Sequence, residues 1–143
     1  MPSLSHVQLT NDSQIAFGER LGLNLKGKSV GVARAEIDDA IAIEFHGAHD
    51  FDSPSAKQCA LAKKFGFDIS NSTKSVGFAV IDDIMHHLNM EAIEKHQLAP
   101  GVTVHNIHQH EKNYVISSIS SDGTVYFKGG NGKRAWARNL ERL

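Results

Sequence analysis

One segment near the N-terminus matches a phosphate-binding motif letter for letter. GLNLKGKS, Gly22 to Ser29, has the spacing of a P-loop, in which backbone N–H groups and a lysine hold the phosphates of a nucleotide. Such a loop follows a buried strand and opens a helix. The apolar residues before Gly22 instead recur at helical spacing. We therefore expect no nucleotide hydrolase, and nucleotide binding at residues 22–29 is a third alternative, behind the two functions given below.

Histidines and one cysteine are the other side chains that could do chemistry. Of the nine histidines, only His105, His108 and His110 have a plausible ligand spacing on one element, but a strand places His105 on the opposite face from the other two. No cysteine or carboxylate pattern completes a metal site, and Cys59 fits a small core residue. We expect no metal, no cofactor and no catalytic residue, so the chain is predicted not to be an enzyme. There are two other histidine clusters: one contains His46, His49 and Asp50, and the other contains His86 and His87.

Basic and aromatic side chains gather at the C-terminal end. Residues 101–143 carry six bases against three acids, whereas residues 1–50 carry four bases against seven acids. Basic groups contact phosphates and exposed aromatic rings stack on bases, so this composition favours a nucleic-acid surface. The candidate binding residues are Tyr126, Lys128, Lys133, Arg134, Trp136 and Arg138.

Strand register decides whether Trp136 can contribute to that surface. If Lys128 pairs with Lys133, Trp136 falls on the face of Val125 and Phe127 and belongs to the core. If Lys128 pairs with Arg134, Trp136 lies beside Tyr126 on the other face. The sequence leaves both arrangements open.

Length and charge limit the class of protein. The chain has 143 residues and a net charge of −1, which fits one ordinary domain or two very small ones. A near-zero net charge argues against a protein coated uniformly in nucleic acid. The sequence has no apolar run of transmembrane length and no signal peptide at its start. We expect a cytoplasmic protein without a membrane partner.

An internal repeat organises the N-terminal part. Residues 14–41 and 58–85 align without a gap. Each copy has an N-terminal helix that ends near a glycine, an extended connector, and a second helix capped by Ser29 or Thr73. The second copy lacks the Gly-Lys of the P-loop pattern but keeps the apolar frame, so the frame does not depend on phosphate. Residues 41–45 alternate well enough to form a short strand instead of a helix.

The C-terminal part has the pattern of short strands. Apolar and polar residues alternate in several runs, and Asp122-Gly123 between two of them predicts a hairpin turn. The fold class is predicted to be α+β. We place a duplicated two-helix repeat domain over residues 1–96 and a small antiparallel β-barrel over residues 97–143.

Both parts resemble known modules. The L-G-[LF]-[ND]-[LI] segments, their Ser/Thr caps and the I-D-D helix ends resemble SAP-type helix–extension–helix modules of bacterial and phage proteins. That resemblance implies that the second helices approach DNA near Lys28 and Lys74. The P-G-x-x-V and D-G-x-V-x-F segments of residues 100–127 resemble an SH3-like barrel of the Tudor, KOW or chromo type, and imply binding to RNA, DNA or protein. The combination suggests a mobile-element or phage-type protein.

Two functions follow from these patterns. The first is a non-enzymatic nucleic-acid-binding accessory protein that uses the basic hairpin of the barrel, helped by Lys28 and Lys74. The alternative is a protein-interaction adaptor that self-associates or binds a partner through the helical repeats. Affinity for phosphates falls steeply with ionic strength, whereas an apolar groove responds little, so salt dependence separates the two.

Overall fold

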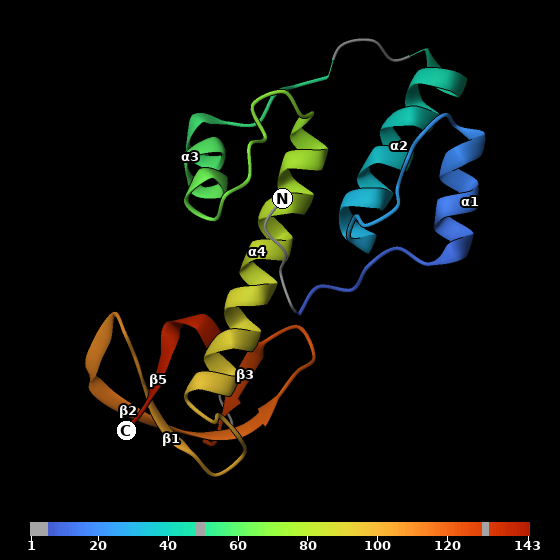
Figure 1. The fold of residues 1–143 in the computed structure, drawn as a ribbon. Coiled ribbons are helices and arrows are strands. Elements are labelled where there is room, and N and C mark those ends of the chain that lie inside the picture. The colour runs from blue at the N-terminus through green and yellow to red at the C-terminus, as the bar shows by residue number, and fades with distance from the viewer. Residues whose placement is uncertain (1–5, 48–50, 130–131) are drawn as a thin grey trace. The chain divides into compact units, whose positions relative to one another are not determined.

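The computed structural model describes residues 6–47, 51–129 and 132–143, and they form an α+β protein (Figure 1). The chain divides into two compact units, Met1–Ile84 and Met85–Leu143, so the division falls inside a helix. The predicted boundary at residue 96 lies just after that helix ends. The described elements are α1 (Asp12–Arg20), α2 (Val30–His46), α3 (Ala56–Lys64), α4 (Lys74–Lys95), β1 (Thr103–Asn106), β2 (Gln109–Ile119), β3 (Thr124–Phe127), β4 (Arg134–Trp136), a 3-10 helix (Ala137–Asn139) and β5 (Leu140–Arg142).

Side-chain caps open helices of the N-terminal unit, at Ser29 and Thr73 as predicted and also at Ser55. Ser29 Oγ accepts the Val32 N–H at 3.1 Å, and Ser55 forms a capping box with Gln58 at the start of α3. Side-chain oxygens at these positions satisfy N–H groups that have no partner inside the helix. Helix α2 continues through residues 41–45 to His46, so the alternative of a short strand there is wrong.

The same backbone contacts recur at aligned positions of the two sequence copies. The Leu23 N–H donates to the Gly18 carbonyl at 2.8 Å, and the Phe67 N–H donates to the Ala62 carbonyl at 3.0 Å. Each connector then buries one aliphatic side chain, Leu25 in the first copy and its counterpart in the second. A Cβ at Gly18 would lie 2.4 Å from Leu25 Cδ1, so a larger residue there would force the Leu25 side chain to shift. The buried apolar residues of this unit are Leu25, Ala33, Ala62, Ile69 and Ile84.

Two reciprocal hydrogen bonds link α2 to α4. Ser29 Oγ donates to Asp83 Oδ2 at 2.5 Å, and Thr73 Oγ1 donates to Asp39 Oδ2 at 2.6 Å. The residue before each helix thus binds a carboxylate within the other helix. Because the start of each helix contacts the interior of the other, α2 and α4 run in opposite directions. Asp39 and Asp83 occupy aligned positions of the two copies, and each accepts a hydrogen bond from the capping residue of the other helix.

The C-terminal unit is an open antiparallel sheet under the end of α4. The strand order is β4-β3-β2-β1-β5, and the sheet does not close, so the predicted barrel closure is not seen among the described residues. The first part of β2 pairs with β1 and its last part pairs with β3. Ala92 and Ile93 of α4 pack on the core of this sheet, as Figure 1 shows for the yellow end of the helix. The buried core residues are Leu98, Val104, Ile116, Val125, Phe127, Ala137 and Leu140.

The predicted hairpin turn joins β2 to β3. Gly123 has a φ of +91°, which glycine adopts without a steric penalty. Asp122 Oδ1 accepts the Thr124 N–H at 2.9 Å. This bond from the Thr124 backbone is the first cause that lowers the pKa of the Asp122 carboxyl below its usual range. The Asp-Gly prediction is confirmed.

In the part of the chain that the structure describes, no helix combines the length and the apolar character needed to cross a bilayer.

Candidate functional site

The register of β3 and β4 decides which predicted residues share a face. Tyr126 pairs with Arg134, and Thr124 pairs with Trp136. This is neither of the two pairings considered from the sequence, but it places Trp136 on the same face as Tyr126 and Arg134 because side chains alternate along a strand. Val125 of β3 points the other way and is buried. The face of Tyr126, Arg134 and Trp136, with Arg138 beside it, is called the hairpin face below.

Trp136 is the exposed aromatic residue of the hairpin face. Its relative exposure is 41%, which is high for a tryptophan. The Arg138 guanidinium carbon lies 5.1 Å from the centre of the Trp136 ring, within the range of a cation–π interaction. The ring is therefore held by a cation while much of its surface contacts solvent.

Asn89 of α4 holds Arg138 in place. Asn89 Oδ1 accepts the Arg138 backbone N–H at 3.1 Å and Arg138 Nη1 at 3.3 Å. Asn89 Nδ2 donates to the Asp122 carbonyl at 3.4 Å, and the Asn89 residue is only 2% exposed. Burial lowers the pKa of the Arg138 guanidinium. Asn89 thus joins α4 to both the hairpin turn and the residue that contacts Trp136.

Sequence reasoning missed Asn89. One signal was present: Asn89 lies four residues before Ile93, which packs on the sheet core, so helical spacing places both side chains on the same side of α4. A polar residue on an inward helical face requires a partner. The partner could not be identified without the fold.

Two predicted lysines lie apart from the hairpin face. The Lys133 ammonium is 5.7 Å from the centre of the Tyr114 ring, and that ring stacks on Phe127 at 4.6 Å. Lys133 therefore belongs to the opposite side of the hairpin from Trp136. Lys128 follows β3 and is exposed. Residues 130–131 of the predicted basic loop lie outside the described residues.

Lys28 and Lys74 belong to the N-terminal unit. Lys28 Nζ donates to both carboxylate oxygens of Glu36 at 2.7 Å, so its charge is already paired. Lys74 opens α4, its backbone N–H donates to the Asp52 carbonyl at 2.7 Å, and it is exposed. Of these two helix-end lysines, Lys74 forms no ion pair with another described residue, so its ammonium is the one available for a ligand.

The segment Gly22–Ser29 lacks the surroundings of a nucleotide-binding loop. Helix α1 precedes it, where such a loop follows a buried strand. Within the described residues, Ser29 takes part in an isolated bridge with Leu9 and in no named strand. The lysine of the motif is bound by Glu36. Motif and fold therefore disagree, as expected from the helical pattern of the preceding residues.

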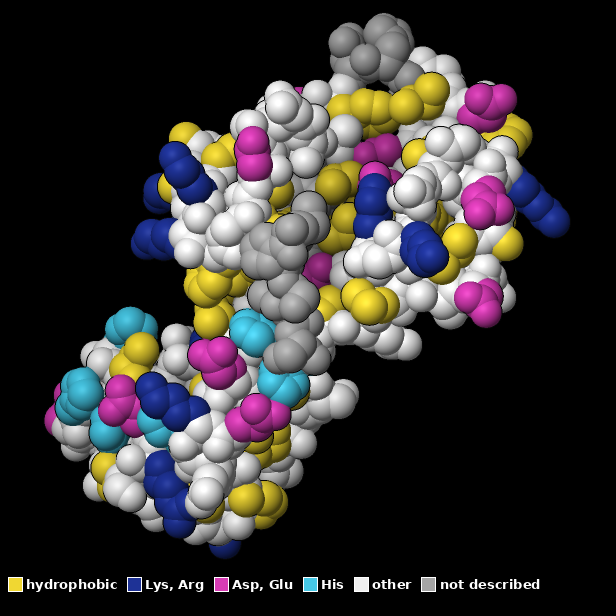
Figure 2. All heavy atoms as spheres, viewed as in Figure 1, with side chains coloured by type: hydrophobic (Ala, Val, Ile, Leu, Met, Phe, Trp, Pro, Cys, Tyr) yellow, Lys and Arg dark blue, Asp and Glu magenta, His cyan; other side chains and the backbone are white. Residues whose placement is uncertain are grey.

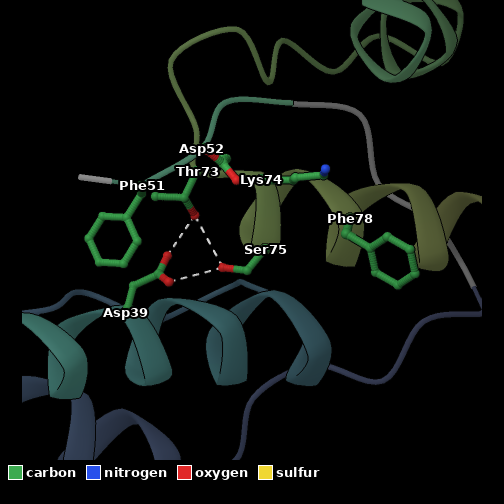
Figure 3. Close-up of a pocket in the computed structure, with 7 residues that line it drawn as sticks. All are labelled: Asp39, Phe51, Asp52, Thr73, Lys74, Ser75 and Phe78. Atoms are coloured by element: carbon green, nitrogen blue, oxygen red, sulfur yellow. Dashed lines mark hydrogen bonds between the residues drawn. The ribbon is translucent and has the colours of Figure 1, made fainter. Parts of the chain in front are cut away.

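A cavity of about 510 Å³ opens between α2, α4 and the chain that precedes α3. In Figure 3, Asp39 points toward Thr73 and Ser75, with Phe51 on one side of this group and Phe78 on the other. Ser75 Oγ donates to Asp39 Oδ1 at 3.0 Å. The polar side chains at the centre of the cavity, Asp39, Thr73 and Ser75, therefore bind one another. The large apolar side chains exposed at the cavity are those of Phe51 and Phe78.

The histidines that the structure describes do not assemble a metal site. The rings of His105 and His110 lie 4.7 Å apart, and His105 Nε2 is 3.5 Å from Glu141 Oε2. Among the residues described, no three or more His, Cys, Asp or Glu side chains lie together in a way that could hold a metal ion. His49 and Asp50, named as part of one cluster, fall outside the described residues.

The surface charge of the C-terminal unit is mixed. On the face drawn in Figure 2, its Lys and Arg side chains lie among His, Asp and Glu side chains. A contact with a polyanion must therefore be local, because no broad basic field covers this face.

Comparison of the chain with protein-family models, with curated proteins and with solved structures finds no match.

Proposed function

We propose that this protein binds nucleic acid, without catalysis, through the hairpin face of its C-terminal unit. The observation that carries the proposal is the strand register, which puts an exposed tryptophan and an arginine on one face and brings Arg138 onto the tryptophan ring. Phosphate contacts from basic residues and stacking on aromatic rings are the two interactions that nucleic-acid surfaces combine.

We propose further that the C-terminal unit is an SH3-like barrel with an open edge. Its strand order, its long β2 shared between two sheet halves and the short 3-10 helix before β5 support this proposal. For the N-terminal unit we propose a duplicated SAP-like module. The recurrence of the same backbone hydrogen bonds in both copies and the reciprocal Ser29–Asp83 and Thr73–Asp39 bonds support it. An origin in a mobile element fits both modules.

A fluorescence-anisotropy titration tests the function. Labelled single-stranded DNA, duplex DNA and RNA are titrated with the full chain at two salt concentrations. Wild type is compared with a Lys128→Ala, Arg134→Ala, Arg138→Ala triple variant, which removes the three cations of the hairpin face and its end. We expect salt-sensitive binding that the triple variant loses.

The control removes the same charge from the other unit. Lys57, Lys63 and Lys64 are exposed residues of α3, and their triple alanine variant changes net charge equally. It should bind like the wild type. Equal loss in both triple variants would indicate a response to net charge alone, and absence of binding to every polymer would remove the proposed function.

A second candidate is a protein-interaction adaptor, favoured by the aromatic cavity of the N-terminal unit. Phe78 is 64% exposed and Phe51 also faces solvent beside the cavity. Large exposed aromatic side chains are typical of protein-binding surfaces. The occupant would be an apolar side chain of a second copy or of another protein. Sedimentation at rising protein concentration tests self-association, which Phe78→Ser should abolish and added salt should hardly change.

A further inference from the structure

We propose that the ligand of the hairpin face is single-stranded nucleic acid, one of whose bases stacks on Trp136, and that Asn89 is the residue that positions this ring through Arg138. This inference rests on the proposed function and names its substrate class. It concerns Asn89, Trp136 and Arg138, which lie in the same compact unit.

The first step is the accessibility of the Trp136 ring. The side chain lies on β4, which is an edge strand of the sheet, and 41% of it is exposed. Arg138 occupies one part of the ring surface at 5.1 Å. An aromatic ring with one side supported and another in solvent can receive a planar base.

The second step excludes duplex as the preferred partner. Bases in a duplex are stacked on one another, so a protein ring reaches their faces only after a base step is opened, which costs a few kcal/mol. Bases of a single strand have free faces. The net charge of the chain, −1, also supplies no strong overall field that would favour a duplex of high charge density.

The third step concerns how the ring is held. A free arginine side chain has many rotamers, and fixing it for a contact is unfavourable in entropy. Asn89 is buried and accepts both the Arg138 backbone N–H and Nη1. It also donates to the Asp122 carbonyl. Arg138 is therefore pre-positioned against Trp136 before any ligand binds, and the loss of entropy on binding is smaller.

The chain has one tryptophan, so the ring in question provides its own spectroscopic probe. Oligo(dT) of about 10 nucleotides, within the range of known single-strand site sizes, is added to the full chain while tryptophan emission is recorded. We expect quenching that saturates with the same affinity as anisotropy reports. A duplex of equal length should bind more weakly and leave the emission nearly unchanged.

Paired substitutions separate stacking from charge. Trp136→Ala should weaken single-strand binding roughly 5- to 160-fold, the range of one stacked base. Trp136→Phe keeps a ring and should retain most of the affinity. Affinity for duplex should respond little to either substitution.

The positioning role has its own readout. Asn89→Ala removes the acceptor for Arg138, whereas Asn89→Asp keeps an acceptor oxygen for Arg138 and loses only the long Nδ2 hydrogen bond to the Asp122 carbonyl. In the absence of ligand, Asn89→Ala should increase the quenching of Trp136 by acrylamide and lower single-strand affinity several-fold, and Asn89→Asp should restore both. Because Asn89→Ala creates a buried cavity, Arg138→Met is the second variant. It leaves the backbone N–H to Asn89 intact and should give the same increase in quenching.

The outcomes distinguish this inference from the proposed function. Binding of single strand and duplex with equal affinity, with no change in Trp136 emission, would overturn the stacking inference while the proposed function stands. Unchanged acrylamide quenching in both Asn89→Ala and Arg138→Met would overturn the positioning role. Absence of binding to every polymer would overturn both proposals.

Discussion

Gly123 illustrates how a single residue couples the hairpin turn to α4. Its φ of +91° is matched by Gly101 at +92°, but the two glycines have different surroundings. A Cβ at Gly123 would lie 2.5 Å from Asn89 Cβ, whereas a Cβ at Gly101 would meet no atom within 4 Å. The two positions therefore separate backbone strain from steric conflict.

We predict that Gly123→Ala destabilises the protein more than Gly101→Ala does. Each substitution forces alanine into a left-handed conformation at about 1–2 kcal/mol. Gly123→Ala adds overpacking against Asn89, worth about 1–3 kcal/mol more. Urea unfolding followed by circular dichroism measures both free energies. Equal losses of unfolding free energy in the two variants would contradict the prediction, because they would show that a Cβ at Gly123 is accommodated beside Asn89 without cost.

The same turn should make the free energy of unfolding depend on pH. The Thr124 N–H binds the ionised Asp122 carboxylate and holds its pKa in the folded protein below the ordinary value of 3.8. A lowered pKa means that the contribution is complete above 3.8 and is lost as pH falls through the folded value. Asp122→Asn keeps an acceptor oxygen without the charge. Urea unfolding from pH 6 downward should therefore show the wild type losing its advantage over Asp122→Asn below about pH 4, and a constant difference at every pH would contradict this.

At the scale of elements, α2 and α4 are joined through their own caps. Ser29 caps α2 and binds Asp83 of α4, and Thr73 does the same with Asp39 in the opposite sense. A hydroxyl can perform both roles because it donates one hydrogen bond and accepts others. Helix formation and helix pairing thus depend on the same atoms.

We predict that Ser29→Ala destabilises by about 2–5 kcal/mol, the sum of about 0.5–2 kcal/mol for a lost cap and about 1.5–3 kcal/mol for a lost bond to a carboxylate. Thr73→Ala should have a smaller effect, because Ser75 still donates to Asp39. Ser70→Ala is the control, since Ser70 donates to Asp68 at 2.6 Å but is exposed and local. Thermal unfolding followed by circular dichroism orders the three variants. A Ser70→Ala effect as large as that of Ser29→Ala would remove the special role of the helix-to-helix bond.

At the scale of the whole molecule, the net charge of −1 restricts how nucleic acid can be bound. A protein without a strong overall field gains little from long-range attraction, so the salt dependence of binding counts local phosphate contacts. The hairpin face and its end offer three cations for such contacts: Lys128, Arg134 and Arg138.

We predict a slope of log affinity against log salt of about −2 for single strands, which corresponds to about three neutralised phosphates. Arg134→Ala should reduce the magnitude of the slope by about 0.7. Trp136→Ala should lower affinity without changing the slope, because a stacking contact releases no counterions. Anisotropy titrations at four salt concentrations provide both quantities. A slope near zero would place binding, if any, on the aromatic cavity of the N-terminal unit.

The sequence by itself determined the features that depend on neighbouring residues. Helix starts at Ser29 and Thr73 and the turn at Asp122-Gly123 were predicted because capping bonds and backbone conformations are local. The α+β class followed from the change between helical and alternating periodicity along the chain.

Only the tertiary structure decided the features that join distant segments. The β3–β4 register is set by burial of Val125 and Phe127, and it exposes Trp136, which the sequence left undecided. The open edge of the sheet, the bonds between α2 and α4 and the capture of Arg138 by Asn89 likewise join residues far apart in the chain. Local propensity carries no information about such pairs, because their energies arise only after the segments have packed together.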